Sequence, residues 1–165
     1  MERIKRGLHI WWPTLLAVTV IMFESTSFFS SEHTGHWLLW LSYWLSILTD
    51  STLHLPWWDI NLILRKVGHA SGYGLASLAF LRSWRLILNE GQSNVWRRLD
   101  IAGVALALLS TLLLASADEF HQSFLPDRTS SINDVMLDFA GACLAQALLF
   151  IYARLAGPGA QPKAG

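Results

Sequence analysis

The sequence predicts an all-α integral membrane protein, a bundle of four transmembrane helices with an additional interfacial or re-entrant segment. Hydrophobic residues make up 53% of the 165 residues, nine residues are Trp, and the mean hydropathy is positive. This composition lies outside the range of ordinary soluble domains. Long apolar runs alternate with short polar segments, as in a chain that crosses a bilayer several times. Because the length is that of one domain, we predict a single membrane domain over residues 1–165.

The apolar runs place the four expected spans at about residues 8–29, 67–88, 101–122 and 135–152. A basic amino terminus precedes the first run, which is also the pattern of a secretory signal peptide. No A-x-A-like cleavage site follows it, so we interpret the run as a retained membrane helix. Pro13 is expected in the first turn of this helix, where proline is tolerated.

A further apolar stretch, residues 37–49, is short for a span. Its thirteen residues would rise only about 20 Å as a helix, against a hydrocarbon core of about 30 Å. Several Trp residues lie within and just after it, and indole rings prefer the headgroup level of a membrane. We therefore predict an interfacial or re-entrant segment here. At the other end of the chain, residues 157–165 are rich in Gly, Pro and Ala, and we expect this tail to be disordered.

The distribution of basic residues orients the four spans. Of the twelve Lys and Arg residues, nine fall on the side of the two termini, and only Arg65, Lys66 and Arg128 fall on the other side. Positively charged residues are retained on the cytoplasmic side of membranes. We therefore predict a multi-pass protein of the cell membrane with cytoplasmic N- and C-termini. If residues 37–49 also crossed the membrane, four arginines would move outside, so the charge bias favours four spans.

Four antiparallel spans bring polar residues from distant parts of the chain to one side of the membrane. The end of the first span, the start of the second, the end of the third and the start of the fourth then lie together at the outer leaflet. The polar residues at these ends are Glu24, Ser25, Lys66, His69, Tyr73, Asp118, Glu119, Gln122, Asp134 and Asp138. Residues three or four apart share a helix face. Small residues would let the helices pack closely around this polar centre, namely Gly72, Gly74, Ala76, Gly141 and Ala142.

Several of the polar residues also have a purely structural interpretation. Asp134 directly precedes an apolar run and could cap a helix, and Arg128 could pair with a neighbouring carboxylate. Tyr73 could be an interfacial aromatic residue. His121, at a helix end near the lipid headgroups, is expected to be a solvated side chain rather than a ligand.

A functional role is favoured for His69 and Asp138, which lie inside the expected spans. A charged side chain at the centre of a membrane helix costs about 2.5–3.5 kcal/mol on insertion scales. His69 with Glu119, Asp118 or Asp138 could bind a divalent metal. The chain contains no H-E-x-x-H or similarly dense ligand motif, and we predict no metal site.

Two motifs resemble those of the VanZ-like membrane family, which is named for a teicoplanin-resistance protein. Residues 65–73 read R-K-V-G-H-A-S-G-Y and resemble the family's D-K-x-x-H-x-x-x-Y, with Arg65 where Asp is usual. Residues 118–141 carry D-E-F-H-Q and then R, D, D and G, and resemble D-E-x-x-Q…R…D-x-x-x-N-x-x-G, with Asp138 where Asn is common. The resemblance covers about residues 23–152. It implies a four-span protein of the cell envelope with a link to antibiotic resistance.

The candidate residues fit a membrane protein that acts on or binds a lipid-linked or envelope-proximal molecule. His69 would be the acid or base, since imidazole titrates nearest neutral pH, and Glu119 and Asp138 would share its proton. Lys66 and Arg128 would hold an anionic group such as a phosphate or carboxylate. The other residues expected to bind the substrate are Tyr73, Asp118, Gln122 and Asp134.

Other functional classes follow from different interpretations of the same residues. The polar cluster could be a satisfied buried network in a non-catalytic membrane interaction protein. Proton-linked transport is disfavoured, because the candidates lie at one end of the bundle and form no path across it.

The net charge is zero, which gives no bias toward nucleic acid, and the single Cys143 excludes an internal disulfide framework. The expected partners are membrane lipids and a lipid-linked or anionic envelope molecule, and the sequence identifies no cofactor.

Overall fold

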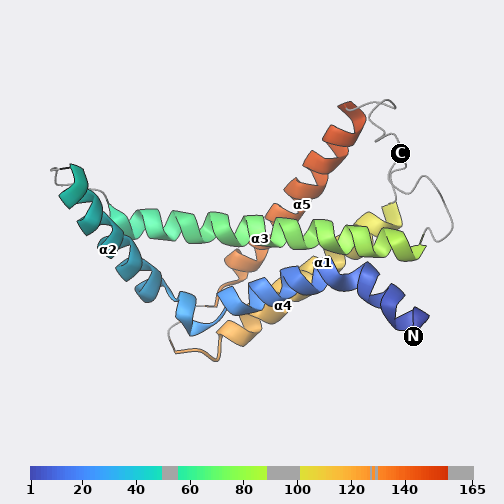
Figure 1. Ribbon diagram of the computed structural model, residues 1–165, viewed down its shortest axis with the longest axis horizontal. Coiled ribbons are helices and arrows are strands. Elements are labelled where there is room, and N and C mark those ends of the chain that lie inside the picture. The colour runs from blue at the N-terminus through green and yellow to red at the C-terminus, as the bar shows by residue number, and fades with distance from the viewer. Residues whose placement is uncertain (50–55, 89–100, 127, 129, 156–165) are drawn as a thin grey trace.

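The computed structural model describes residues 1–49, 56–88, 101–126, 128 and 130–155, and every regular element in this part of the chain is helical (Figure 1). The all-α prediction is therefore confirmed. The elements are α1 (Glu2–Glu24), the short 3-10 helix η1 (Ser27–Phe29), α2 (Ser31–Thr49), α3 (Trp57–Leu88), α4 (Ile101–Gln122) and α5 (Ile132–Leu155). The tail that we expected to be disordered, residues 157–165, lies outside the described residues.

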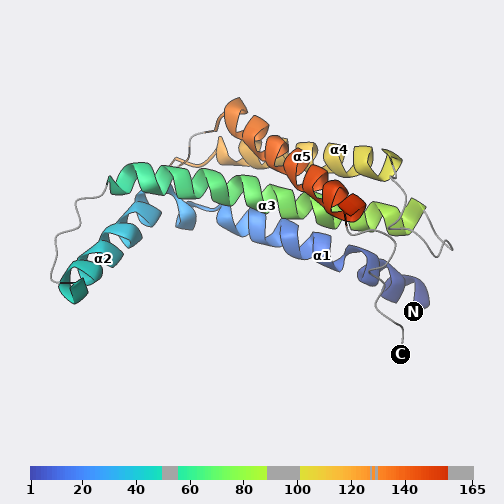
Figure 2. The ribbon, with the colours of Figure 1, turned by 90° about the horizontal axis from the view of Figure 1, so that it is seen from above.

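Helix α3 is the axis of the bundle. It packs against α1, α2, α4 and α5, and the ribbon shows α5 crossing it while α2 leaves the bundle at an angle (Figures 1 and 2). A buried apolar cluster joins four helices at this axis, and its members are Ile21, Tyr73, Ala76, Ala115 and Val135. The core therefore lies where α1, α3, α4 and α5 meet, and α2 stands outside it.

Three of the described helices, α1, α4 and α5, are long and apolar enough to cross a membrane. Helix α3 is longer, with 32 residues, but it carries charged side chains toward both ends and is not among the three. Helix α2 is not among them either. The chain thus has the helices of a membrane protein.

Helices α2 and α3 both begin earlier than the apolar runs indicated. Helix α2 starts at Ser31, where the Ser30 hydroxyl accepts a hydrogen bond from the His33 amide at 3.4 Å. Its 19 residues rise about 28 Å. The added residues 31–36 are polar, so the apolar part of α2 is still the run 37–49, and its interfacial or re-entrant placement stays a prediction. Helix α3 starts at Trp57 with Asp59 in its first turn, a favourable place for an acidic side chain. The polar motif of α3 consequently lies in the interior of the helix and not at its start.

Pro13 lies in the interior of α1, not in its first turn as predicted, because the helix begins close to the amino terminus. A proline has no amide hydrogen, so the carbonyl of His9, four residues before it, loses its helical partner. The Arg82 guanidinium of α3 donates to this carbonyl at 3.3 Å and to the carbonyl of Ile10 at 2.8 Å. The polar side chain thus replaces the hydrogen bond that the proline removes.

Two glycines set the distance between α3 and α5. A Cβ atom at Gly141 would overlap the carbonyl oxygen of Ala70, and it would lie 2.8 Å from the carbonyl carbon. A Cβ atom at Gly74 would lie 3.2 Å from the carbonyl oxygen of Gly141 and 3.2 Å from the Cβ of Ala145. The prediction of close packing is confirmed for these two glycines. It is wrong for Gly72, which faces open space. The close crossing holds the first turns of α5 against the polar motif of α3.

Candidate functional site

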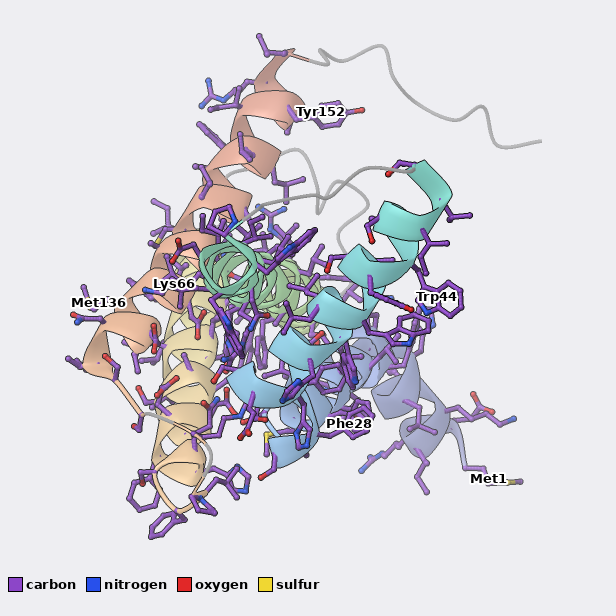
Figure 3. All side chains as sticks on the ribbon, turned by 90° about the vertical axis from the view of Figure 1, so that its left-hand side faces the viewer. Met1, Phe28, Trp44, Lys66, Met136 and Tyr152 are labelled. Atoms are coloured by element: carbon purple, nitrogen blue, oxygen red, sulfur yellow. The ribbon has the colours of Figure 1, made fainter. Side chains whose placement is uncertain are left out.

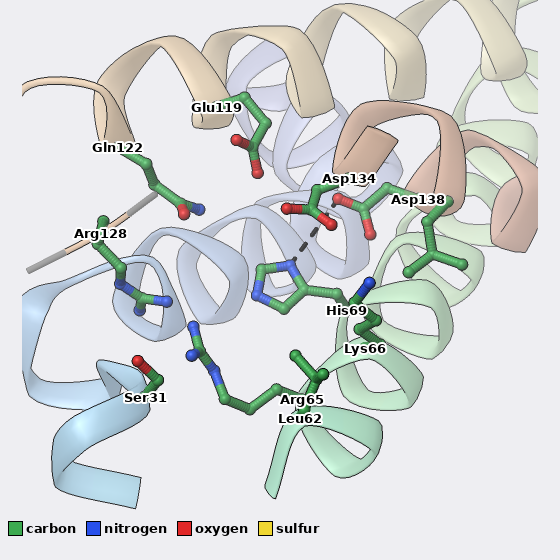
Figure 4. A pocket seen from close by; sticks show the side chains of 11 residues that line it. Ser31, Leu62, Arg65, Lys66, His69, Glu119, Gln122, Arg128, Asp134 and Asp138 are labelled. Carbon is green, nitrogen blue, oxygen red and sulfur yellow. Dashed lines mark ion pairs between the residues drawn. The ribbon is translucent and has the colours of Figure 1, made fainter. Parts of the chain in front are cut away.

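A polar cavity of about 130 Å³ lies where α3, α4 and α5 meet, beside the start of α2 (Figure 4). A dry cavity of about 150 Å³ is large enough to bind benzene, so this one has room for a group of a few heavy atoms. The predicted residues that line it are Lys66, His69, Glu119, Gln122, Arg128, Asp134 and Asp138. Four further residues, Ser31, Leu62, Arg65 and Leu137, complete its wall.

His69 and Asp138 face each other across the cavity. Nδ1 of His69 lies 3.8 Å from Oδ2 of Asp138, which is within ion-pairing distance but too long for a hydrogen bond. Asp138 is 1% exposed, and within the described residues neither of its carboxylate oxygens has a hydrogen-bond partner. The His69 side chain is 23% exposed. The imidazole is therefore the accessible member of the pair, and the carboxylate behind it has two oxygens free to accept a proton or a donor group.

A buried hydrogen-bonded network supports the His69 ring from behind. The Tyr73 hydroxyl donates to Oδ2 of Asp118 at 2.8 Å, and the Gln122 amide donates to the same oxygen at 3.0 Å. The rings of His69 and Tyr73 are stacked, with centroids 6.4 Å apart. Tyr73 is only 1% exposed, so the interpretation of an interfacial aromatic residue is wrong. Tyr73 and Asp118 are not among the residues that line the cavity, and they act as its support.

Glu119 joins the end of α4 to the start of α5. Its Oε2 accepts a hydrogen bond from the backbone amide of Ser131 at 2.8 Å. The Ser131 hydroxyl in turn accepts one from the amide of Asn133 at 3.1 Å, as a helix N-cap does. The cap is therefore Ser131, and the N-cap interpretation of Asp134 is wrong. Asp134 lies in the first turn of α5, and its carboxylate has no hydrogen-bond partner within the described part of the chain.

Arg128 connects the turn before α5 to the end of α1. Its Nη2 donates to the backbone carbonyls of Glu24 and Thr26, the latter at 2.7 Å. Among the described residues it makes these bonds instead of the predicted pair with a carboxylate. Burial, and then the like charge of Arg65, lower the pKa of Arg128 from its usual value. An arginine stays protonated even so, and its buried Nε has no partner within the described residues.

Arg65 lines the cavity, although it was not among the site residues predicted from the sequence. It lies one helical turn before His69 and one turn after Leu62, and both of these also line the cavity. The carboxylate of Asp134, on another wall of the same cavity, attracts the guanidinium of Arg65. This guanidinium lies close to the guanidinium of Arg128 (Figure 4). Arg65 lies three residues after Leu62 and four before His69, and this spacing places all three side chains on one face of α3.

Lys66 and His121 lie at or beyond the edge of the site. Lys66 lines the cavity from an exposed position on α3 (Figure 3). His121 is exposed at the end of α4, as expected for a solvated side chain. Among the described residues, no group of three or more His, Cys, Asp or Glu side chains could hold a metal ion.

The sequence also matches a known protein family. A family model described as VanZ/LLP1 matches residues 10–153, which is most of the chain. No curated protein and no solved structure matches it.

Proposed function

The chain belongs to the VanZ/LLP1 family, and we propose that its polar cavity binds or acts on a lipid-linked or envelope-proximal anionic molecule at the outer leaflet. The observation that carries this proposal is Asp138, a fully buried carboxylate whose oxygens have no hydrogen-bond partner within the described residues. A buried charge without partners is costly. The cost is offset if the carboxylate shares a proton with His69 or receives a donor from a ligand.

The proposed topology has four spans, formed by α1, residues 67–88 of α3, α4 and α5, with α2 at the interface. It is supported by the antiparallel packing of α1 and α3. At one end the hydroxyls of Thr14 and Ser83 are 2.9 Å apart, and at the other end Ile21 packs in the cluster that contains Tyr73. With both termini in the cytoplasm, as the distribution of basic residues favours, the cavity opens at the outer leaflet.

Within this cavity His69 is the acid–base residue. Its ring is accessible from the cavity, and its Nδ1 faces Asp138. A carboxylate behind an imidazole orients the ring and stabilises its protonated form. Glu119 contributes less to proton transfer, because one of its oxygens is already bonded to the Ser131 amide. Arg65, beside Arg128, is the donor for an anionic group of the ligand.

A second candidate function is that of a non-catalytic interaction protein with a structural polar network. The bonds from Tyr73 and Gln122 to Asp118 favour it, since they are buried and well formed. A buried polar network stabilises a fold when all of its members have hydrogen-bond partners. The carboxylate of Asp138 has none among the described residues. A binding or catalytic site therefore explains the buried Asp138 carboxylate, which a structural network leaves unexplained.

Conservative substitutions separate the two functions. We expect His69→Ala and Asp138→Asn to leave membrane abundance and thermal stability in detergent close to those of the parent, while the biological effect of the protein is lost. Because the family is named for teicoplanin resistance, teicoplanin susceptibility of expressing cells is the first effect to measure. His121→Ala, at an exposed histidine outside the cavity, is the matched control. If both cavity variants keep the full effect, the site proposal is wrong, and if both fail to accumulate in the membrane, the structural network is favoured.

A further inference from the structure

An apolar groove of about 410 Å³ adjoins the polar cavity. It lies between the end of α1, α2 and the first half of α3, and its apolar wall consists of Phe29, Trp37, Leu38, Leu41, Leu64 and Gly68. Arg65 and His69 line both the groove and the polar cavity. The groove and the polar cavity are therefore adjacent, and Arg65 and His69 form the boundary between them.

We infer that the groove holds the hydrocarbon chain of a phosphate-bearing membrane lipid whose phosphate occupies the polar cavity. This inference rests on the proposed function and names its substrate class. The polar cavity has room for a few heavy atoms only, whereas the groove has the volume of a small-molecule site. An amphiphile is the kind of ligand that fills a small polar space and a larger apolar space side by side.

The head of the ligand is identified by the donors at the boundary. Arg65 lines the cavity, where Asp134 is the carboxylate that attracts it, and Nε of the neighbouring Arg128 is buried without a hydrogen-bond partner among the described residues. A guanidinium offers a planar fork of N–H donors that matches two oxygens of a phosphate. Two like charges side by side are also stabilised by an anion between them. On the opposite wall, Asp134 and Asp138 are acceptors for hydroxyl or ammonium groups attached beyond the phosphate.

The tail of the ligand is identified by the exposed apolar surface of the groove. Trp37 and Leu41 line the groove, and each side chain is still 45% exposed. Helix α2, which carries them, leaves the bundle, and Trp44 further along it points away from the other helices (Figure 3). A hydrocarbon chain lying along α2 and α3 would cover this surface.

One glycine on α3, Gly68, allows the groove to be filled without disturbing the bundle, and a second, Gly72, provides a control. A Cβ atom at Gly68 would meet nothing within 4 Å, although the residue lines the groove, so the side chain of Gly68→Leu would occupy the space assigned to the tail. A Cβ atom at Gly72, one turn further on, would also meet nothing within 4 Å, and Gly72 lines neither space. Gly72→Leu is therefore the matched control. Arg65→Gln removes the charge at the boundary.

The experiment measures binding of inorganic phosphate and of hexyl, dodecyl and hexadecyl phosphate to the purified full chain in a neutral detergent, by native mass spectrometry. We expect the affinity of the parent to rise at least roughly tenfold from inorganic phosphate to hexadecyl phosphate, because each added methylene leaves water. Gly68→Leu should abolish most of this rise and leave inorganic phosphate unaffected, whereas Gly72→Leu should behave as the parent. Arg65→Gln should weaken binding of every phosphate.

The possible outcomes distinguish the tail site from the proposed function. If Gly68→Leu keeps the full dependence on chain length while Arg65→Gln weakens binding, the tail site is wrong and the proposed function stands. If inorganic and alkyl phosphates do not bind the parent, both fail. If dodecanoate binds as tightly as dodecyl phosphate, the assignment of a phosphate is overturned. If binding depends on chain length but not on Arg65, the groove is a site for lipid tails that is separate from the polar cavity, and the inference is wrong.

Discussion

The contact between Gly141 and α3 makes a quantitative prediction about the assembly of the site. In Gly141→Ala the new methyl group would overlap the Ala70 carbonyl and lie 2.8 Å and 2.9 Å from the carbonyl carbon and Cα of that residue. All three atoms belong to the backbone, so the helices have to move apart. Overpacking of this kind costs about 1–3 kcal/mol, and we expect a loss of that size in the free energy of unfolding.

Two glycines on α3, Gly72 and Gly74, allow the cost of an added methyl group to be compared with that at Gly141 of α5. Gly74→Ala places a methyl group 3.2 Å from Ala145 and from the Gly141 carbonyl, which is a tighter contact than usual but not an overlap. Gly72→Ala meets no atom within 4 Å, and it should stabilise the helix by up to about 1 kcal/mol because alanine is the better helix former. We therefore expect stability to fall in the order Gly72→Ala, Gly74→Ala, Gly141→Ala, measured by denaturant unfolding of the purified protein in detergent. Equal stability of Gly141→Ala and Gly72→Ala would refute the close crossing of α3 and α5.

Two further predictions concern the support of the site and the topology. Tyr73→Phe removes the hydroxyl that donates to Asp118 and leaves the ring, so we expect a loss of about 1–3 kcal/mol in the free energy of unfolding; a change below about 0.5 kcal/mol would contradict the buried hydrogen bond. For the topology, a tag inserted at Asn94 should be inaccessible from outside intact cells and become accessible after permeabilisation, and labelling in intact cells would overturn the four-span layout.

The fold class could be predicted because it depends on composition and on long apolar runs. Helix α4 covers Ile101–Gln122, the residues of the expected third span, and it carries no charged side chain before Asp118 near its end. The start of α3 could not be predicted in the same way. Its first turns carry Asp59 and Asn61, and Asn61 donates to the carbonyl of Ser31 at 2.9 Å, a tertiary contact that hydropathy does not reveal.

The residues around the cavity were accessible to sequence reasoning to the extent that they follow helical spacing. His69 and Asp138 could be predicted because a charge inside a span is costly. Arg65 was not predicted as a cavity residue, although it lies four residues before His69 and therefore on the same face of α3. The burial of Tyr73 could not be foreseen, because it depends on Asp118, which lies 45 residues away in the chain.

The close crossing of α3 and α5 explains why the second sequence motif ends in a glycine, Gly141. Gly141 follows Asp138 by three residues, and the backbone it contacts belongs to Ala70, the residue after His69. The absence of a side chain at Gly141 therefore lets the turn with the carboxylate approach the turn with the imidazole. A larger residue there would move the helix turns that carry His69 and Asp138, whose Nδ1 and Oδ2 atoms are already 3.8 Å apart. For this reason Gly141→Ala should impair the function of the site even in a detergent or lipid in which the protein stays folded, and an unaltered function at reduced stability would show that the crossing does not control the pair.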